Sequence, residues 1–404
     1  MILKIAIRNI FRQKRRSLFT ALSIFGGFVM AVIFIGWADG SYNNIIDMFT
    51  RSRLGHIQIH ETDYLNHPSL YKTVDNLEEI EHALQDMKDI DSWTSRIFSA
   101  GLASVGEKTT GVQIVGVDPE REARTTQFNE KIIKGRPFPL PPSHEAIIGK
   151  GLAEILNAGL NDKVVIVSQA ADGSIANDQY KVIGISESED NIMDRTSFFL
   201  HIKDAQELLV LEGRVHEVAI TVSKLNKVKK VSTQLENKIN NPDLSVDPWQ
   251  EFAKAFYIAM KVDKEGMWIM LIVIIIIVAV GVLNTVLMSV LERQREYGVL
   301  KAIGTRPHQI IKLVLLEVDL LAIACIFIGI GVGFLINSFL STHGITLSTP
   351  FSYGGMKFQS LQSEINTRSF TVPAITVLFA ATLVSFFPAI KAARTDPAKS
   401  MRIH

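Results

Sequence analysis

The segment GMWIMLIVIIIIVAVGVLNTVLMSVL, residues 266–291, decides the fold, because it contains 26 residues without a single charge. A helix needs about 20 apolar residues to cross a bilayer core about 30 Å thick, so this segment predicts a membrane-spanning helix. The charged sequence ERQREYGVLKAIGTRPHQIIK, residues 292–312, follows directly, and the chain turns apolar again at Leu313. We therefore expect a membrane helix, a short charged helix and a returning membrane helix.

Three more charge-free stretches elsewhere in the chain are long enough to cross a bilayer. The four transmembrane helices that we predict are residues 17–38, 266–291, 313–340 and 369–390. Between the first two lie 227 mostly polar residues, 39–265, which are enough for one or two soluble domains. The predicted fold class is an α-helical membrane protein with four transmembrane helices plus an α+β extracytoplasmic domain.

The distribution of Lys and Arg beside these spans predicts their orientation. Residues 1–16 carry six basic side chains, residues 292–319 carry five and the tail 391–404 carries four, whereas the loop 341–368 carries two. This bias places both termini and the segment 292–312 in the cytoplasm. The large domain and the loop 341–368 then lie outside the cytoplasm. A cleaved signal peptide fits less well, because the first apolar run is too long and no A-x-A site follows it.

Residues 1–16 alternate apolar and basic side chains at helical spacing, which predicts an amphipathic helix on the cytoplasmic membrane surface. The alternative is a topology signal without a surface role. Small residues inside the spans predict close helix packing. They are Gly26 and Gly27 in the first span, and Gly329 and Gly333 in the third.

The segment 39–265 changes from a helical to an alternating pattern, with strands and helices interspersed. Residues 54–60 read as a strand that presents His56 and His60 on one face, where we expect them to be solvated. Two further strands, 164–167 and 180–185, are joined by a polar tip. The tip residues, a candidate hairpin for a chaperone or cargo, are Ala171, Asp172, Gly173 and Ser174.

No motif in the sequence predicts a catalytic, nucleotide or metal site. Gly101 to Thr109 approaches a P-loop, but Glu107 stands where a lysine is required, so we read a strand and a turn. His144-Glu145 begins an H-E-x-x-H zinc motif, yet Ile148 occupies the position of the second histidine. The net charge of +1 leaves no basic face for nucleic acid. We expect no enzymatic activity, no metal and no cofactor in this chain.

Residues 296–304 carry the strongest functional signal. Val299, Leu300 and Ile303 share one face of a predicted short helix, Gly304 supplies its stop, and Pro307 fixes the turn into the next span. A short cytoplasmic helix with an apolar ridge would fit a partner's groove. The alternative is an ordinary interfacial loop.

Several quoted segments resemble one family of transport proteins. ERQREYGVLKAIGTRPHQIIKLVLLE, residues 292–317, and FPAIKAARTDPAKSMR, residues 387–402, resemble the signature of FtsX-like permeases. RNIFRQKRRSLFTALSIFGG, LGHIQIH and EAIIGKGLAEILNAGLNDKVVIV are similar to the lipoprotein-releasing LolC/LolE branch and its MacB relatives. This resemblance implies that the spans lie in a bacterial inner membrane and that the large domain is a MacB-like porter and Sabre arrangement in the periplasm. Unlike MacB, the chain is expected to have no fused ATPase domain.

The resemblance also implies partners. A cytoplasmic ABC ATPase dimer, which holds ATP and Mg, would work beneath two permease copies, either a homodimer or two related subunits. The residues that match the coupling helix of the family are Glu296, Tyr297, Val299, Leu300, Lys301, Ile303 and Gly304.

The resemblance implies that the cargo is a lipoprotein or another amphiphile extracted from the inner membrane. In LolC-type subunits a proline-rich hairpin engages a periplasmic chaperone, but residues 168–179 here contain no proline. Engagement of a periplasmic chaperone therefore stays open, as do a LolE-like role, a homodimer and a different cargo. The alternative functions are MacB-like efflux or mechanotransmission with an adaptor protein, and FtsX-like signalling to a cell-wall hydrolase.

Overall fold

The computed structural model describes residues 2–188, 190–353 and 356–396. They form two compact units. The first comprises Met1–Asn44, Lys261–Leu347 and Ser360–His404, and the second comprises Ile45–Met260 and Ser348–Gln359.

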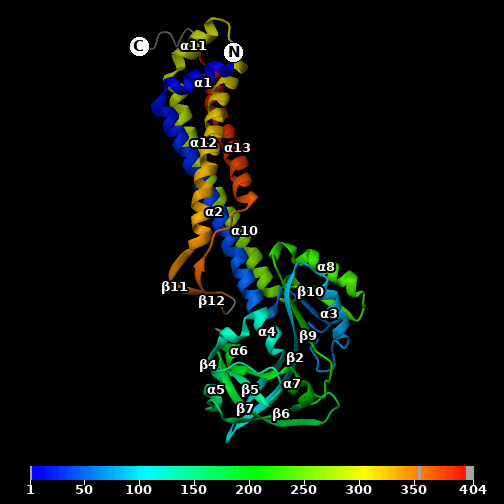
Figure 1. Cartoon of the computed structure of the whole chain (residues 1–404). Helices are drawn as coiled ribbons and strands as arrows, with labels where there is room; N and C mark the ends of the chain where they lie inside the picture. The colour runs from blue at the N-terminus through cyan, green and yellow to red at the C-terminus, as the bar shows by residue number, and fades with distance from the viewer. Residues whose placement is uncertain (1, 189, 354–355, 397–404) are drawn as a thin grey trace. The chain divides into compact units, whose positions relative to one another are not determined.

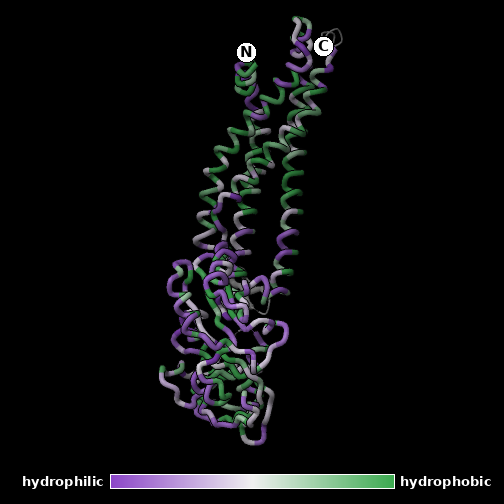
Figure 2. The backbone as a smooth tube through the Cα atoms, turned by 90° about the vertical axis from the view of Figure 1, so that its right-hand side faces the viewer, coloured by the Kyte–Doolittle hydropathy of each residue, from purple (hydrophilic) through white to green (hydrophobic). Residues whose placement is uncertain are grey.

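The first unit is a bundle of helices (Figure 1). Four of its helices are long and apolar enough to cross a membrane, which confirms the predicted number of spans in the described part of the chain. Figure 2 shows that they are hydrophobic along most of their length within the bundle. The helices are α1 Ile2–Arg12, α2 Lys14–Phe49, α10 Lys254–Glu292, α11 Gln294–Ala302, α12 Pro307–His343 and α13 Thr367–Ala393.

Buried apolar side chains at intervals of four residues hold the bundle together. On α2 they are Ile24, Phe28 and Val32, and on α10 the ridge includes Val278 and Val282. Residues four apart form a ridge along one helix face that fits the groove of a neighbouring helix. The bundle core is therefore a set of interlocking ridges.

Three of the four glycines predicted to permit close packing do so. A Cβ atom at Gly27 would overlap Val278, one at Gly329 would overlap Phe28, and one at Gly333 would lie 2.8 Å from a methyl carbon of Val32. Helices without a Cβ at the crossing can approach closely and gain dispersion contacts. Gly26 is different, because a Cβ there would meet no described residue within 4 Å. The packing role of Gly26 therefore stays a prediction.

The second unit is built on a ten-stranded mixed sheet in the order β10-β1-β9-β2-β3-β8-β5-β7-β4, with β6 paired to β2 and β7. Strands β3 and β8, and likewise β5 and β7, run parallel, and the other pairs are antiparallel. The strands are β1 Ile57–Glu61, β2 Ile90–Val105, β3 Lys108–Val117, β4 Ile132–Gly135, β5 Glu145–Gly149, β6 Lys163–Gln169, β7 Ile175–Ser186, β8 Ser197–His201, β9 Glu217–Val222 and β10 Leu244–Pro248.

Seven α-helices accompany this sheet, so the predicted α+β domain is confirmed. They are α3 Leu77–Gln85, α4 Pro119–Thr126, α5 Lys150–Leu156, α6 Asn191–Thr196, α7 Ile202–Leu209, α8 Val228–Ile239 and α9 Trp249–Phe252. Short π and 3₁₀ turns cover Thr50–Leu54, Phe128–Lys131 and Leu225–Lys227, and a separate two-stranded sheet pairs β11 Ile345–Tyr353 with β12 Met356–Leu361. The P-loop-like segment lies in the β2–β3 hairpin, as predicted.

The histidines of β1 are buried, which corrects the expectation that they are solvated. His56 is 0% and His60 is 1% exposed. Groups outside β1 cover them: Asp47 Oδ1 lies 3.2 Å from Nε2 of His56, which directly precedes β1, and the Tyr64 ring stacks on His60 with 5.2 Å between the centroids. His56 Nδ1 accepts a hydrogen bond from the backbone N–H of Val222 at 2.9 Å, and His60 Nε2 lies 3.5 Å from Glu217.

A buried ion cluster joins β2, β9 and α4. The Arg96 guanidinium donates to Glu122 Oε1 at 2.7 Å and to Glu217 Oε1 at 2.8 Å, and all three side chains are at most 8% exposed. Thr94 and Thr126 donate further hydrogen bonds to Glu122. Burial alone would raise the pKa of Glu122, but the charge of Arg96 outweighs burial and lowers that pKa. Both carboxylates of the cluster are therefore paired with the Arg96 guanidinium.

Replacing Arg96 by leucine should strongly destabilise the protein, because it leaves two carboxylates buried without their cation. We expect a loss of about 3–5 kcal/mol in the free energy of unfolding, measured by denaturant titration of the purified chain. The matched control is Arg124→Leu, whose pair with Glu120 is exposed and contributes about 1 kcal/mol or less. Equal losses in the two variants would contradict this account of the cluster.

Candidate functional site

The short helix α11 connects two of the long helices. It ends in a Schellman motif, in which Thr305 N–H donates to Leu300 O and Gly304 N–H donates to Lys301 O, each at 3.0 Å. Gly304 has a φ of +98°, a conformation that costs glycine little. Pro307 is the first residue of α12. The predicted stop at Gly304 is therefore confirmed.

The apolar face of α11 is divided between the bundle and solvent. Tyr297 is 1% exposed, and Leu300 packs beside it against the bundle core. Val299 and Ile303 are instead 46% and 74% exposed. Leu300 is only partly exposed, because it follows Tyr297 by three residues and packs against the bundle core. The exposed ridge consists of Val299 and Ile303.

Lys301 makes a contact inside the unit. Its Nζ donates to the backbone oxygens of Ala393 at 3.1 Å and Thr395 at 2.8 Å. These carbonyls lie at the C-terminal end of α13, where unpaired backbone oxygens carry partial negative charge. Lys301 thus ties α11 to α13, and its side chain is engaged there.

A second contact ties α11 to α12. Arg293, directly before α11, is 5% exposed, and its guanidinium lies 2.9 Å from Glu296 and 2.9 Å from Glu317. Asn9 of α1 donates to the other oxygen of Glu317 at 2.6 Å, and Arg12 lies 3.8 Å from Glu296. A buried guanidinium that pairs with two carboxylates can adopt only a few orientations, so these contacts fix the position of Arg293. Sequence reasoning missed Arg293 and Asn9, because their partner on α12 lies far along the chain.

These contacts define what the segment can do mechanically. Contacts with α1, α12 and α13 hold the two ends and the buried face of α11. The described residues leave the ridge of Val299 and Ile303 exposed. Figure 1 shows α11 and α1 at the same end of the bundle. A force applied to the ridge would therefore be passed to three helices at once.

The predicted hairpin tip is a turn on the surface of the second unit. Ser174 O accepts from the backbone N–H of Ala170 at 3.0 Å, and Gly173 adopts a φ of +85°. The backbone N–H of Ala171 donates to Leu209 O of α7 at 2.9 Å, and Ile175 beside the tip is 80% exposed. The structure thus presents this tip to solvent, while its proposed role in binding chaperone or cargo stays a prediction.

The second unit also contains a cavity of about 1580 Å³. One part of its wall is aromatic and includes Phe98 and Phe199, and another part carries the Arg96 cluster. Lys131 also lines it, and its Nζ donates to the backbone oxygen of Ser52. Burial lowers the pKa of Lys131 to about 8.

The Lys131 ammonium should give the protein a measurable pH dependence. Its pKa is lower in the folded than in the unfolded state, so the unfolded state binds more protons above pH about 8, and stability rises with pH. We expect a gain of about 1–2 kcal/mol between pH 7.5 and about 9.5. Above that range, burial of Tyr64 and Tyr180, which raises their pKa values, acts in the opposite direction.

Lys131→Gln is the test variant for this dependence, and thermal unfolding at the two pH values is the measurement. The variant should lose the gain while the wild type keeps it. The same rise in both proteins would assign the pH dependence to other groups.

Comparison with known proteins places these features in context. The Lipoprotein-releasing system transmembrane protein LolC of Neisseria meningitidis is 23% identical over 396 residues, which cover 95% of this chain and 92% of the relative. The Macrolide export ATP-binding/permease protein MacB of Campylobacter jejuni is 23% identical over 98% of this chain and 60% of the relative. The periplasmic region of MacB from Actinobacillus actinomycetemcomitans aligns with 49% of this chain and 91% of that structure, at 13% identity and a TM-score of 0.38.

Two family profiles match successive parts of the chain. The MacB-like periplasmic core domain matches residues 17–238, more than half of the chain, and the FtsX-like permease C-terminal region matches residues 268–397. The second match contains α11 with its exposed ridge and its anchoring contacts. The chain therefore belongs to the family of ABC transporter permeases that combine a MacB-like periplasmic core domain with an FtsX-like permease region.

Proposed function

We propose that this protein is the permease subunit of an ABC transporter that extracts lipoproteins from the bacterial inner membrane. The relative from Neisseria meningitidis, a lipoprotein-releasing protein by name, aligns with nearly the whole length of both chains, which supports this choice of cargo. A separate cytoplasmic ATPase dimer, with its own ATP and Mg, supplies the energy. Two permease copies, identical or related, complete the transporter.

The observation that carries the proposal is the exposed Val299–Ile303 ridge on an otherwise anchored helix. Two exposed apolar side chains on an anchored helix can insert into a hydrophobic groove of a partner protein. In our proposal the ATPase binds this ridge with different affinity in its nucleotide-bound and nucleotide-free states. Such a difference in affinity is what allows nucleotide binding to shift the permease between two conformations.

In our proposal the long helices transmit a displacement of α11 to the unit that handles the cargo. Both α2 and α10 are continuous helices that contribute residues to both compact units. A shift of α11, transmitted through the Arg293–Glu317 contact and the bundle core, would therefore reach the ends of these helices in the second unit. The second unit would then act on a lipidated protein in the outer leaflet of the inner membrane.

The main alternative is MacB-like efflux or mechanotransmission with a periplasmic adaptor. The alignment with the MacB relative over 98% of this chain favours it, and so does the absence of proline from residues 168–179. FtsX-like signalling to a cell-wall hydrolase is the third candidate. The three differ in what the second unit binds, which an experiment can separate.

Charge introduced on the ridge should uncouple the ATPase. We expect Ile303→Asp and Val299→Asp to lower permease-stimulated ATP hydrolysis about tenfold or more, because an apolar interface would then have to bury an unpaired carboxylate. The measurement is ATP hydrolysis by the reconstituted complex relative to the ATPase alone. Both residues are exposed, so the variants should keep the wild-type unfolding temperature.

The matched control for these variants is His308→Asp, which adds the same charge at an exposed position in the first turn of α12. It should retain wild-type stimulation. Normal stimulation in both ridge variants, or equal loss in the control, would contradict the assignment of the ridge as the docking surface.

A photo-crosslinking residue at Ile175, the exposed position beside the hairpin tip, should capture the cargo in living cells. We expect a lipoprotein in the crosslinked band, and we expect the band to weaken when the ridge variant Ile303→Asp is combined with the probe. Mass spectrometry identifies the captured protein. Capture of a periplasmic adaptor would favour efflux, and capture of a hydrolase would favour signalling; either would contradict lipoprotein extraction.

A further inference from the structure

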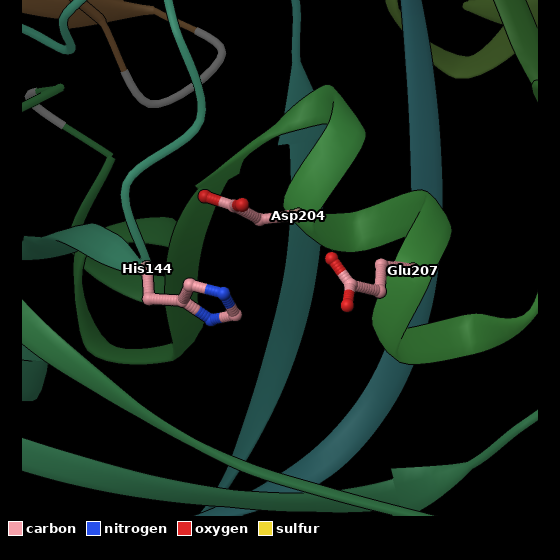
Figure 3. Close-up of side chains that lie close together, drawn as sticks. All are labelled: His144, Asp204 and Glu207. Carbon is pink, nitrogen blue, oxygen red and sulfur yellow. The ribbon is translucent and has the colours of Figure 1, made fainter.

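Three potential metal ligands from two distant segments meet on the second unit. His144 lies directly before β5, and Asp204 and Glu207 lie on α7, where a spacing of three residues places them on the same side of the helix. One ligand atom from each side chain lies within 4.8 Å of the others. Figure 3 shows the imidazole and the two carboxylates arranged around a common space.

The Asp204 carboxylate is the unusual member of this cluster. It is 2% exposed, and among the residues that the structure describes its Oδ2 has no hydrogen-bond partner. Burial raises the pKa of Asp204, although the nearby His144 and the backbone N–H groups of Ser143 and His144 favour the charged form. A buried carboxylate oxygen without a partner is costly. A cation bound at this position would remove that cost.

The contacts of His144 leave one ring nitrogen available to bind a cation. Its Nδ1 lies 3.0 Å from Asp178 Oδ2, and its ring stacks on Tyr180 with 5.9 Å between the centroids. Because Nδ1 is engaged by Asp178, Nε2 is the nitrogen that remains for a metal, and Figure 3 shows one ring nitrogen on the side of the two carboxylates. Metal-bound histidines commonly donate their second N–H to a carboxylate in this manner, which fixes the ring orientation.

We propose that His144, Asp204 and Glu207 form a binding site for a divalent first-row transition-metal ion, with Zn²⁺ as the representative. One imidazole and two carboxylates suit such an ion better than Mg²⁺, which prefers an all-oxygen octahedral shell. The two carboxylates balance its charge, and three protein ligands leave a fourth position for water. A tetrahedral ion needs its ligand atoms roughly 3.4 Å apart, so the exposed side chains of His144 and Glu207 must close on it.

The ion would connect two parts of the second unit. It would hold the loop before β5 against α7, and α7 in turn contacts the hairpin tip through the bond from Ala171 N–H to Leu209 O. Local sequence motifs do not predict this site, because its ligands are separated by 60 residues along the chain. Glu145, the acid of the incomplete zinc motif, pairs with Arg136 at 2.6 Å and is not a ligand. The site is independent of the proposed transport function.

Isothermal titration of the full-length chain with ZnCl₂ tests the proposal, in detergent and without an affinity tag. We expect one equivalent to bind with a dissociation constant of about 10 µM or lower, and no heat from MgCl₂ at the same concentrations. The variants Asp204→Asn, His144→Gln and Glu207→Gln should each weaken Zn²⁺ binding about tenfold or more. His67→Gln is the matched control, because His67 also pairs with a carboxylate, Asp63, but lies outside the cluster; it should bind Zn²⁺ like the wild type.

Thermal unfolding with and without ZnCl₂ separates loss of the site from loss of the fold. Zn²⁺ should raise the unfolding temperature of the wild type and of His67→Gln, and leave that of the ligand variants unchanged. Without metal, Asp204→Asn should be at least as stable as the wild type, because it removes a buried charge. Failure of the wild type to bind Zn²⁺ at 100 µM free ion (about ten times the expected constant), or unaltered binding by His144→Gln and Glu207→Gln, would overturn the proposal.

Discussion

The buried pair between Arg293 and Glu317 is the interaction on which the membrane unit depends mechanically. A guanidinium that is 5% exposed needs carboxylates in a fixed geometry, and Glu296 and Glu317 provide them from α11 and α12. Asn9 donates to Glu317 Oε1, which also accepts from Arg293 at 3.2 Å, and so brings in α1. This network prevents the nine residues of α11 from moving independently of the long helices. The short helix α11 therefore acts as a lever, because any displacement of it also displaces the long helices.

A displacement of α11 can affect the rest of the protein only if the helix bundle transmits it. Lipid tails are as apolar as the helices, so close contacts between helices, and not burial from water, must hold the bundle. The ridges of α2 and α10 supply such contacts, and Gly329 and Gly333 allow α12 to approach Phe28 and Val32 of α2. A tightly interlocked core resists continuous deformation and so favours movement between discrete packings. This is the behaviour required of a permease that couples to a nucleotide cycle.

Much of the fold could be predicted because it follows from local rules. Bilayer thickness sets the length of residues 266–291, and the Schellman stop at Gly304 needs only a glycine after a short helix. The ends of the long helices could not be found in this way: α2 continues to Phe49, well past Ala38, because polar residues continue a helix once the apolar stretch ends. Alternation over residues 54–60 predicted one solvated face, but Asp47 contacts His56 and Tyr64 stacks on His60, and alternation alone does not show which face the fold covers.

The site was only partly predictable, for a related reason. The position and the stop of α11 follow from the residues between 292 and 307. Which of Val299, Leu300 and Ile303 remain exposed depends on where Tyr297 packs, and that is decided by α12 and α13. The cluster of His144 with Asp204 and Glu207 was missed altogether, because strand order brings β5 and α7 together and no local pattern encodes it.

Site-directed crosslinking tests the central claim most directly, namely that α11 rests against a separate ATPase on the cytoplasmic side. Cys325 is the only cysteine of the chain, so its replacement by serine provides a background in which Ile303→Cys is the sole thiol. In inverted inner-membrane vesicles, a short bismaleimide should join this thiol to a cysteine placed in the groove of the ATPase, with a yield that changes when nucleotide is added. Modification of Ile303→Cys from the periplasmic side by a membrane-impermeant maleimide, with no adduct to the ATPase, would contradict the account.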